Sequence, residues 1–175
     1  MDAEYIAIGA AALVVVAGFV LAGELLPVQP GGNGERPVGE PGSEHLHAQL
    51  FISINGTEKV LNGSYLERAA RVHLHGSDSI LHVHADRVDL DYALRTLAIS
   101  VNSSCIRFGL ENESVCGYPA TGVRVNGEQM SIDAAMDHGI AQGDTIVIWT
   151  GEQPPDGFDR ELPPEYKEAA PGRSV

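Results

Sequence analysis

The sequence predicts an α+β fold, with a mostly antiparallel sheet and one or two short helices, preceded by a single transmembrane helix. Short alternating segments are separated by turn-forming sequences such as Asn-Gly, which predicts hairpins. Two segments, which begin at Asp89 and Ser131, have the polar start and apolar spacing of short amphipathic helices. A long apolar run lies close to the N-terminus. A β-grasp-like arrangement is one member of this class of folds.

The apolar run extends from Tyr5 to Gly23 and contains nineteen residues without a charged side chain. As a helix it would be about 28 Å long, which is enough to span a bilayer. A cleaved signal peptide is the alternative, but its apolar region is usually about 7–15 residues long and follows a basic stretch. This run instead follows Asp2 and Glu4. We therefore predict a retained anchor at residues 1–26.

Two segments of low hydrophobicity flank the predicted domain. Residues 27–44 are dense in Gly and Pro and have no hydrophobic period, which predicts a flexible linker. Residues 151–175 combine Pro-Pro pairs with acidic side chains and predict a disordered acidic tail. The folded domain is therefore expected at residues 45–150.

The elements of this domain are expected to form two successive strand-and-helix groups. Asp89 is the expected N-cap of the first helix, and the second helix is expected from Ser131 to about Asp137. Turns are expected at Asn55-Gly56 and Asn126-Gly127. The expected strands are Leu46–Ile54, Arg71–His75, Ile80–Ala85, Ser104–Phe108, Gly122–Val125 and Asp144–Trp149.

Cysteines and glycosylation sequons indicate that the domain is extracytoplasmic. Cys105 and Cys116 are the only cysteines, and their spacing is typical of a local disulfide, which persists in oxidising compartments. The positive-inside rule does not predict an orientation, because the first basic residue after the span is Arg36. Four of the six asparagines lie in candidate glycosylation sequons, although single Asn-Gly and Asn-Ser pairs also mark turns. These are Asn55, Asn62, Asn102 and Asn112.

The net charge argues against nucleic acid as a partner. The chain has 24 acidic and 11 basic residues, which gives a formal charge of -13. Such a surface repels a phosphate backbone. The predicted location is the cell membrane, with one span and the C-terminal domain outside.

Six of the seven histidines occur in three His-x-His pairs. The pairs are His45 with His47, His73 with His75, and His82 with His84. Residues i and i+2 of a strand point to the same face, so each pair presents two imidazoles together. In a hairpin we expect His75 opposite His82 and His73 opposite His84, with directly opposed Cβ atoms roughly 5 Å apart.

This arrangement predicts a copper or zinc site. Imidazole binds zinc, copper, nickel and iron, and histidine-rich ligation without paired thiolates favours copper or zinc. His73, His75, His82 and His84 are the expected ligands, and His45 and His47 complete the shell or form a second site. Candidate carboxylate ligands or acceptors for ring N–H groups are Glu44, Asp78 and Asp86. The seventh histidine, His138, is expected to interact with the dipole at the end of the second helix.

The order of these motifs resembles a group of membrane-anchored archaeal and bacterial proteins. The string begins at His45-Leu-His-Ala, continues through Val72-His-Leu-His-Gly and Leu81-His-Val-His-Ala, and is followed by the cysteine pair. Members share an N-terminal membrane segment, this HxHA…HLH…HxH pattern and two cysteines. The resemblance spans most of residues 45–150. It implies the same domain limits and the grouping of the six histidines, and no particular activity.

The predicted function is a membrane-tethered domain that stores, delivers or senses copper or zinc. A flexible linker would let it reach a membrane oxidase or transporter. One alternative is a metalloenzyme that uses three or four histidines and an open coordination position. Another is a surface interaction or assembly module in which the histidines only pack. The sequence leaves open whether the site is catalytic.

Overall fold

The computed structural model describes residues 37–61, 69–75, 79–117, 121–151, 156–158 and 160–167, with His75 described by its backbone. The predicted membrane anchor, Asn62 and Asp78 lie outside these ranges. Within them, no helix has the length and hydropathy needed to cross a membrane.

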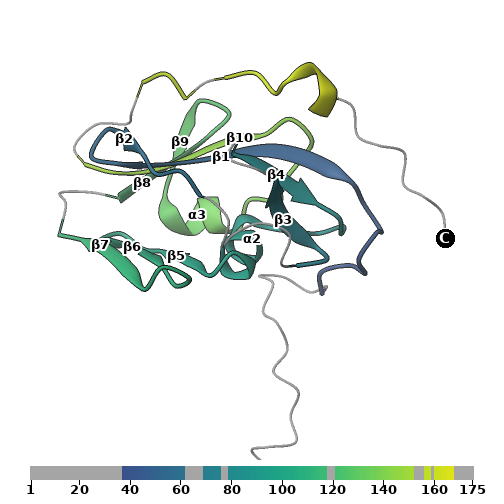
Figure 1. Ribbon diagram of the computed structural model, residues 1–175, viewed down its shortest axis with the longest axis horizontal. Helices are drawn as coiled ribbons and strands as arrows, with labels where there is room; N and C mark the ends of the chain where they lie inside the picture. The colour runs from purple at the N-terminus through teal and green to yellow at the C-terminus, as the bar shows by residue number, and fades with distance from the viewer. Residues whose placement is uncertain are drawn as a thin grey trace, which may run out of the picture. The chain divides into compact units, whose positions relative to one another are not determined.

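A large sheet of seven strands forms the centre of the domain (Figure 1). Its strands are β1 (Leu46–Ile54), β2 (Thr57–Glu58), β3 (Val72–His75), β4 (Ile80–Val83), β8 (Thr121–Val125), β9 (Glu128–Met130) and β10 (Thr145–Thr150). They follow the order β3-β4-β1-β10-β8-β9, and β2 pairs with β1 outside this path. The central pair, β1 and β10, is parallel, and the pairings on either side of it are antiparallel.

Two short helices and a small sheet complete the main body of the domain. The small antiparallel sheet contains β5 (Ile99–Val101), β6 (Cys105–Phe108) and β7 (Glu113–Cys116). The helices are α2 (Leu90–Thr96) and α3 (Ile132–Met136), and a 3-10 turn, η2 (Pro164–Tyr166), follows near the C-terminus. The predicted α+β class, with a mostly antiparallel sheet and two short helices, is confirmed at this level.

Both helices begin where polar N-caps were expected. The Asp89 carboxylate accepts a hydrogen bond from the Tyr92 backbone N–H at 2.7 Å, and the Ser131 hydroxyl accepts one from the Ala134 N–H at 3.3 Å. These bonds satisfy N–H groups that have no partner inside the first turn. Local sequence therefore fixes where α2 and α3 start.

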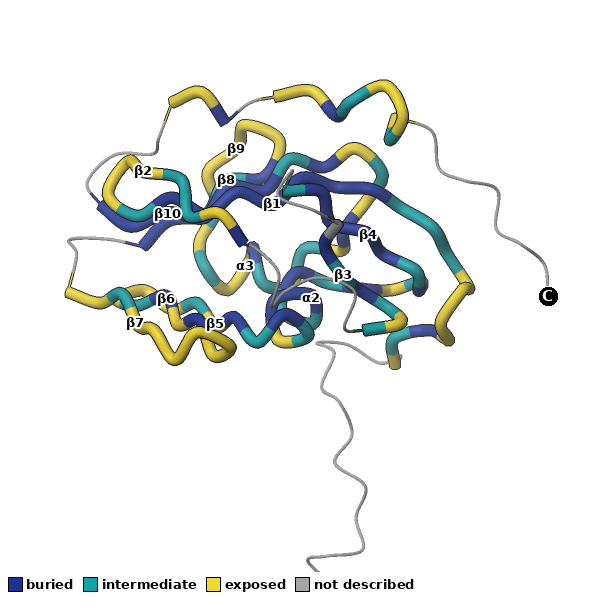
Figure 2. Tube along the Cα trace, in the orientation of Figure 1, coloured by how far each residue is buried: buried dark blue, intermediate teal, exposed yellow. Residues whose placement is uncertain are grey.

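The central strand β1 is buried on both of its faces, as Figure 2 shows for the middle of the large sheet. Leu50 and Ile52 belong to the main core, which also includes residues of both helices and the small sheet. Phe51 points the other way and packs in a second cluster with Val147, Trp149 and Phe158. The alternation of side chains along a strand separates these two clusters. The large sheet therefore needs a cover on each face.

The cover of the second face comes from a segment that was predicted to be disordered. We call residues 156–158 and 160–167 the C-terminal strap; Figure 1 shows it on the side of the large sheet opposite the helices. Phe158 is 6% exposed, and its ring centroid lies 5.4 Å from that of Phe51. Leu162 is also buried. The average composition of the tail is polar, but these two side chains bury enough apolar surface to hold the strap on the sheet.

Part of the predicted linker also packs on the domain. The Gly39 N–H donates to the carbonyl of Asp86, and the carbonyl of Gly39 accepts from Arg71 Nε at 2.8 Å. A Cβ at position 39 would lie 1.5 Å from the Asp86 carboxylate oxygen, so a larger residue there would displace the Asp86 side chain. The Gly-rich composition predicted a flexible segment, whereas the backbone of Gly39 makes close contacts with Asp86 and Arg71.

The predicted disulfide between Cys105 and Cys116 is present and joins directly opposed residues of β6 and β7. Lys59, which follows β2, forms ion pairs with Glu111 and Glu113 beside this small sheet. The hydrogen bonds that Lys59 donates to Glu111 and then to Glu113 raise its pKa. Three predicted sequon asparagines are exposed, namely Asn55, Asn102 and Asn112.

Replacing Phe158 with alanine is expected to lower the free energy of unfolding by about 3 kcal/mol, because a buried aromatic ring is lost from the second cluster. Urea unfolding followed through the fluorescence of Trp149, the only tryptophan, measures the change. The control is Glu165→Ala, an exposed site in the same strap, with an expected change below about 0.5 kcal/mol. Equal stability of Phe158→Ala and the wild type would contradict a packed strap.

Candidate metal centre

Three histidines lie in one row across the adjacent strands β3, β4 and β1. His73 is directly opposite His82 in the β3–β4 pair, and His82 is directly opposite His47 in the β4–β1 pair. Directly opposed side chains share a face of the sheet. Their neighbours Leu81 and Val83 point into the main core. The three imidazoles therefore lie on the strap side of the sheet.

The predicted register of the β3–β4 hairpin is wrong. We expected His75 opposite His82 and His73 opposite His84, whereas His75 is opposite Ile80. The expected pairing would have placed Ile80 and Leu81 beyond the end of β3, although both belong to the expected strand Ile80–Ala85. In the structure both residues belong to β4 and are fully buried, which favours the observed register. The shift is by an even number of residues, so the histidines keep the same face.

Five imidazoles form one cluster on this face, and we call them the histidine cluster: His45, His47, His73, His82 and His84. The ring centroids of His47 and His82 are 4.7 Å apart, and those of His45 and His84 are 4.6 Å apart. His73 lies 5.5 Å from His82 and 4.9 Å from His84, with stacked rings. The first His-x-His pair, His45 and His47, is part of the cluster because β1 pairs with β4.

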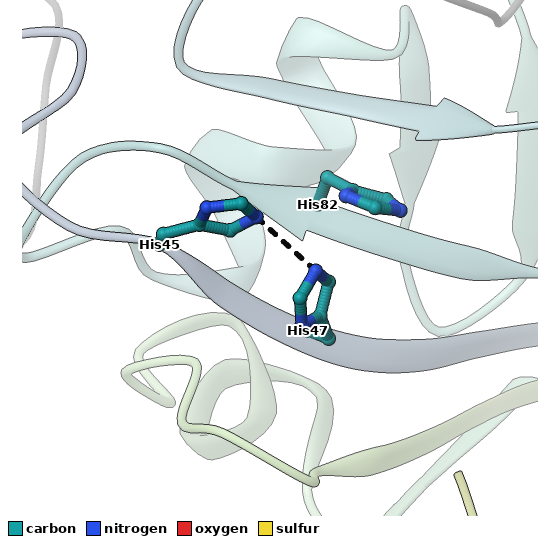
Figure 3. A group of neighbouring side chains, drawn as sticks. All are labelled: His45, His47 and His82. Atoms are coloured by element: carbon teal, nitrogen blue, oxygen red, sulfur yellow. Dashed lines mark hydrogen bonds between the residues drawn. The ribbon is translucent and has the colours of Figure 1, made fainter. Parts of the chain in front are cut away.

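The cluster contains two overlapping sets of three histidines whose ligand nitrogens all lie within 4.8 Å of one another. The inner trio is His45, His47 and His82, and the outer trio is His73, His82 and His84. Figure 3 shows the inner trio, with the rings of His45 and His47 turned toward each other and His82 beside them. Among the described residues, both trios consist of histidines without a carboxylate.

The spacing within the inner trio suits a metal ion. The Nε2 atoms of His45 and His47 are 3.2 Å apart. Two nitrogens bound to a tetrahedral zinc ion lie about 3.3 Å apart, because each is about 2.0–2.1 Å from the metal. The same 3.2 Å is also the length of a hydrogen bond between the two rings. The pair is therefore held at a chelating distance by a contact that an ion can replace.

Hydrogen bonds hold the ring of one candidate ligand, His73, and the backbone of another, His47. His73 Nδ1 lies 3.2 Å from the carbonyl oxygen of Ala69, and because a carbonyl only accepts, Nδ1 carries the proton. This tautomer leaves the lone pair of His73 on Nε2, which is the arrangement found around histidines that bind metals. The His47 backbone N–H donates to Gln142 Oε1 at 2.9 Å, which fixes the start of β1 beside the cluster.

The strap lies against the inner trio through Tyr166. The Tyr166 ring centroid is 5.1 Å from that of His47 and 5.5 Å from that of His82, in an edge-on contact with the latter. Gln142 connects the strap to β1, because its amide N–H donates to the Tyr166 carbonyl at 2.7 Å and its amide oxygen accepts from the His47 backbone N–H. His47 and His82 are 5% and 6% exposed. The inner trio is consequently a partly covered, polar site.

The remaining candidate residues have other partners. Glu44 accepts from the His45 backbone N–H, and Asp86 accepts from the Ser43 hydroxyl and pairs with Arg87. His138 follows α3, but its Nε2 lies 2.8 Å from a carboxylate oxygen of buried Asp144, which is a more specific contact than the predicted helix dipole. The His75 side chain and Asp78 lie outside the described residues.

Sequence reasoning missed Gln142 and Tyr166. Both lie far along the chain from the histidines that they contact, in a loop and in the predicted tail. No motif links them to the His-x-His pairs. Predicting these contacts would have required knowing that β1 pairs in parallel with β10, because this pairing brings the loop before β10 to the start of β1.

Comparison of the chain with models of known protein families, with curated proteins and with solved structures finds no significant match. The resemblance drawn from the histidine and cysteine pattern therefore stays a prediction. The case for function rests on the geometry of this site.

Gln142→Leu is expected to loosen the strap, because leucine has a similar size and cannot form the hydrogen bonds to His47 and Tyr166. We expect a loss of about 1–2 kcal/mol in unfolding free energy and faster hydrogen exchange at the His47 amide. Exchange measured by NMR tests this, with Gln129→Leu at an exposed position of β9 as the control. Unchanged protection at His47 would show that the bridge through Gln142 does not hold the strap.

Proposed function

We propose that this protein is a membrane-tethered extracytoplasmic module that binds copper or zinc for storage, delivery or sensing. The observation that supports this most directly is the convergence of five imidazoles that lie on or next to three adjacent strands, with candidate ligand nitrogens within 4.8 Å of one another in each trio. Imidazole nitrogens are good ligands for both metals. The site sits on a hydrogen-bonded sheet, so its ligands are arranged before an ion arrives.

The burial of these histidines supports metal binding over simple packing. Burying an imidazole costs more free energy than burying an apolar side chain at the same strand position, so apolar packing alone does not account for histidine there. His47 and His82 occupy such buried positions on the central strands. A bound cation would use the nitrogens of several rings at once. The net charge of -13 also favours accumulation of cations near the surface.

The proposed location rests on features at both ends of the chain. The uncharged run from Tyr5 to Gly23 supports a membrane anchor. The disulfide between Cys105 and Cys116 supports an oxidising compartment, and the exposed positions of three sequon asparagines are compatible with glycosylation. We propose that the tether keeps the domain close to a membrane partner such as an oxidase or transporter.

We also propose that the large sheet is β-grasp-like. Its strand order places a parallel central pair between two antiparallel hairpin arms, and α2 follows the first arm in the chain. In this description β3 extends the first arm, and the small sheet of β5, β6 and β7 is an insertion before β8.

Metal titration of the full chain in detergent tests the proposed function. We expect stoichiometric binding of Zn²⁺ or Cu²⁺ by the wild type, measured by calorimetry and by metal analysis after desalting. A variant with His45, His47 and His82 changed to asparagine is expected to lose at least about tenfold in affinity, because three ligands are removed.

His138→Gln is the matched control, because it removes a histidine outside the cluster and an amide can still bond to Asp144. It is expected to bind metal like the wild type. Absence of stoichiometric metal in the wild type would contradict the proposal, and so would equal affinity in the triple variant and the control.

Deleting residues 1–26 is expected to release the protein from the membrane fraction, because the apolar run that crosses the bilayer is removed. Carbonate extraction of membranes followed by immunoblotting measures the distribution. Deletion of residues 168–175 is the control and should leave the protein in the membrane. Protease added to intact cells should cleave the domain of the full chain, and complete protection would contradict an external location.

A further inference from the structure

His82 belongs to both trios of the histidine cluster. A neutral imidazole has a hydrogen on one ring nitrogen and a lone pair on the other, so it donates to one metal ion at a time. Two ions therefore cannot each be held by three neutral histidines here. His82 is the candidate ligand that the two trios share.

The two positions differ in burial. The inner trio contains two buried histidines, His47 and His82, whereas in the outer trio only His82 is buried. Tyr166 of the strap packs against both buried rings of the inner trio. His73 and His84 are half-buried. The inner position is thus the more protected from water, and the outer position is the more accessible to an incoming or departing ligand.

We propose that the histidine cluster is a two-position relay for one copper or zinc ion, with a covered holding position at the inner trio and an exchange position at the outer trio. This inference rests on the proposed function and adds delivery to it. In the transfer, the ion keeps its bond to His82, breaks its bonds to His45 and His47, and forms bonds to His73 and His84. All five imidazoles stay neutral, so no proton, electron or further reactant is needed.

The rings between the two positions are already close enough for stepwise ligand exchange. His45 and His84 have centroids 4.6 Å apart, so the ion is near an outer ligand before it leaves the last inner one. His73 and His84 are stacked 4.9 Å apart, and His73 has its Nδ1 hydrogen fixed by Ala69. Each step replaces one nitrogen with another, so the coordination number of the ion does not fall to one.

Zinc release from the full chain tests the relay. The chain is loaded with Zn²⁺, an excess of a chromophoric chelator is added, and the rate of zinc transfer is followed together with the zinc content per chain. Two double variants separate the positions: His73→Asn with His84→Asn removes the exchange position, and His45→Asn with His47→Asn removes the holding position. His138→Gln is the control.

We expect the wild type to bind one zinc ion per chain. The exchange-position variant should also bind one ion with little change in affinity, but it should release zinc more slowly than the wild type, by about tenfold or more. The holding-position variant should bind at least about tenfold more weakly and release zinc faster. His82→Asn should be weaker than either double variant, because it damages both positions.

Two results would overturn the relay while leaving the proposed function intact. One is two tightly bound ions per wild-type chain, which would indicate a bridged pair. The other is faster release from the exchange-position variant, which would indicate a single site made from all five rings. Absence of zinc from the wild type would instead refute the proposed function itself. Circular dichroism and Trp149 fluorescence test whether each variant is folded. Where an asparagine variant does not fold, the same position is changed to glutamine instead.

Discussion

The pairing of β4 with both β3 and β1 is the constraint on which the rest of the site depends. The register is set on the opposite face, where Leu81 and Val83 enter the main core, because a slip by one residue would expose them and bury the histidines in apolar surroundings. Once that register is fixed, His73, His82 and His47 must lie in one row. The geometry of the histidine cluster is therefore a consequence of apolar packing on the far side of the sheet.

The same sheet explains why the strap is needed. A central parallel pair between antiparallel neighbours is covered on both faces, and the helices supply only one of these covers. The strap supplies the other with Phe158 at one end and Tyr166 at the other. Gln142 links the end of the strap that carries Tyr166 to the start of strand β1, beside the histidine cluster. The strap thus affects both the stability of the second cluster and the access to the inner trio.

Much of the local structure was predictable, and the long-range arrangement was not. Polar caps at Asp89 and Ser131, the alternation of β1 and the opposed cysteines are properties of short segments, and the structure confirms them. The predicted β3–β4 register was wrong although the expected strands, which end at His75 and begin at Ile80, were nearly right, because we paired histidine with histidine instead of His75 with Ile80. The strap was missed because two apolar anchors are hidden in a polar, Pro-rich composition.

The central claim is that imidazoles of this cluster bind one metal ion, and X-ray absorption spectroscopy of the zinc-loaded full chain tests it most directly. The account predicts a first shell of nitrogen or oxygen at about 2.0–2.1 Å, with the outer-shell scattering typical of several imidazoles and none from sulfur. The zinc content per chain and the imidazole scattering should both fall in the variant that lacks His45, His47 and His82. A shell without imidazole scattering in the wild type would contradict the account.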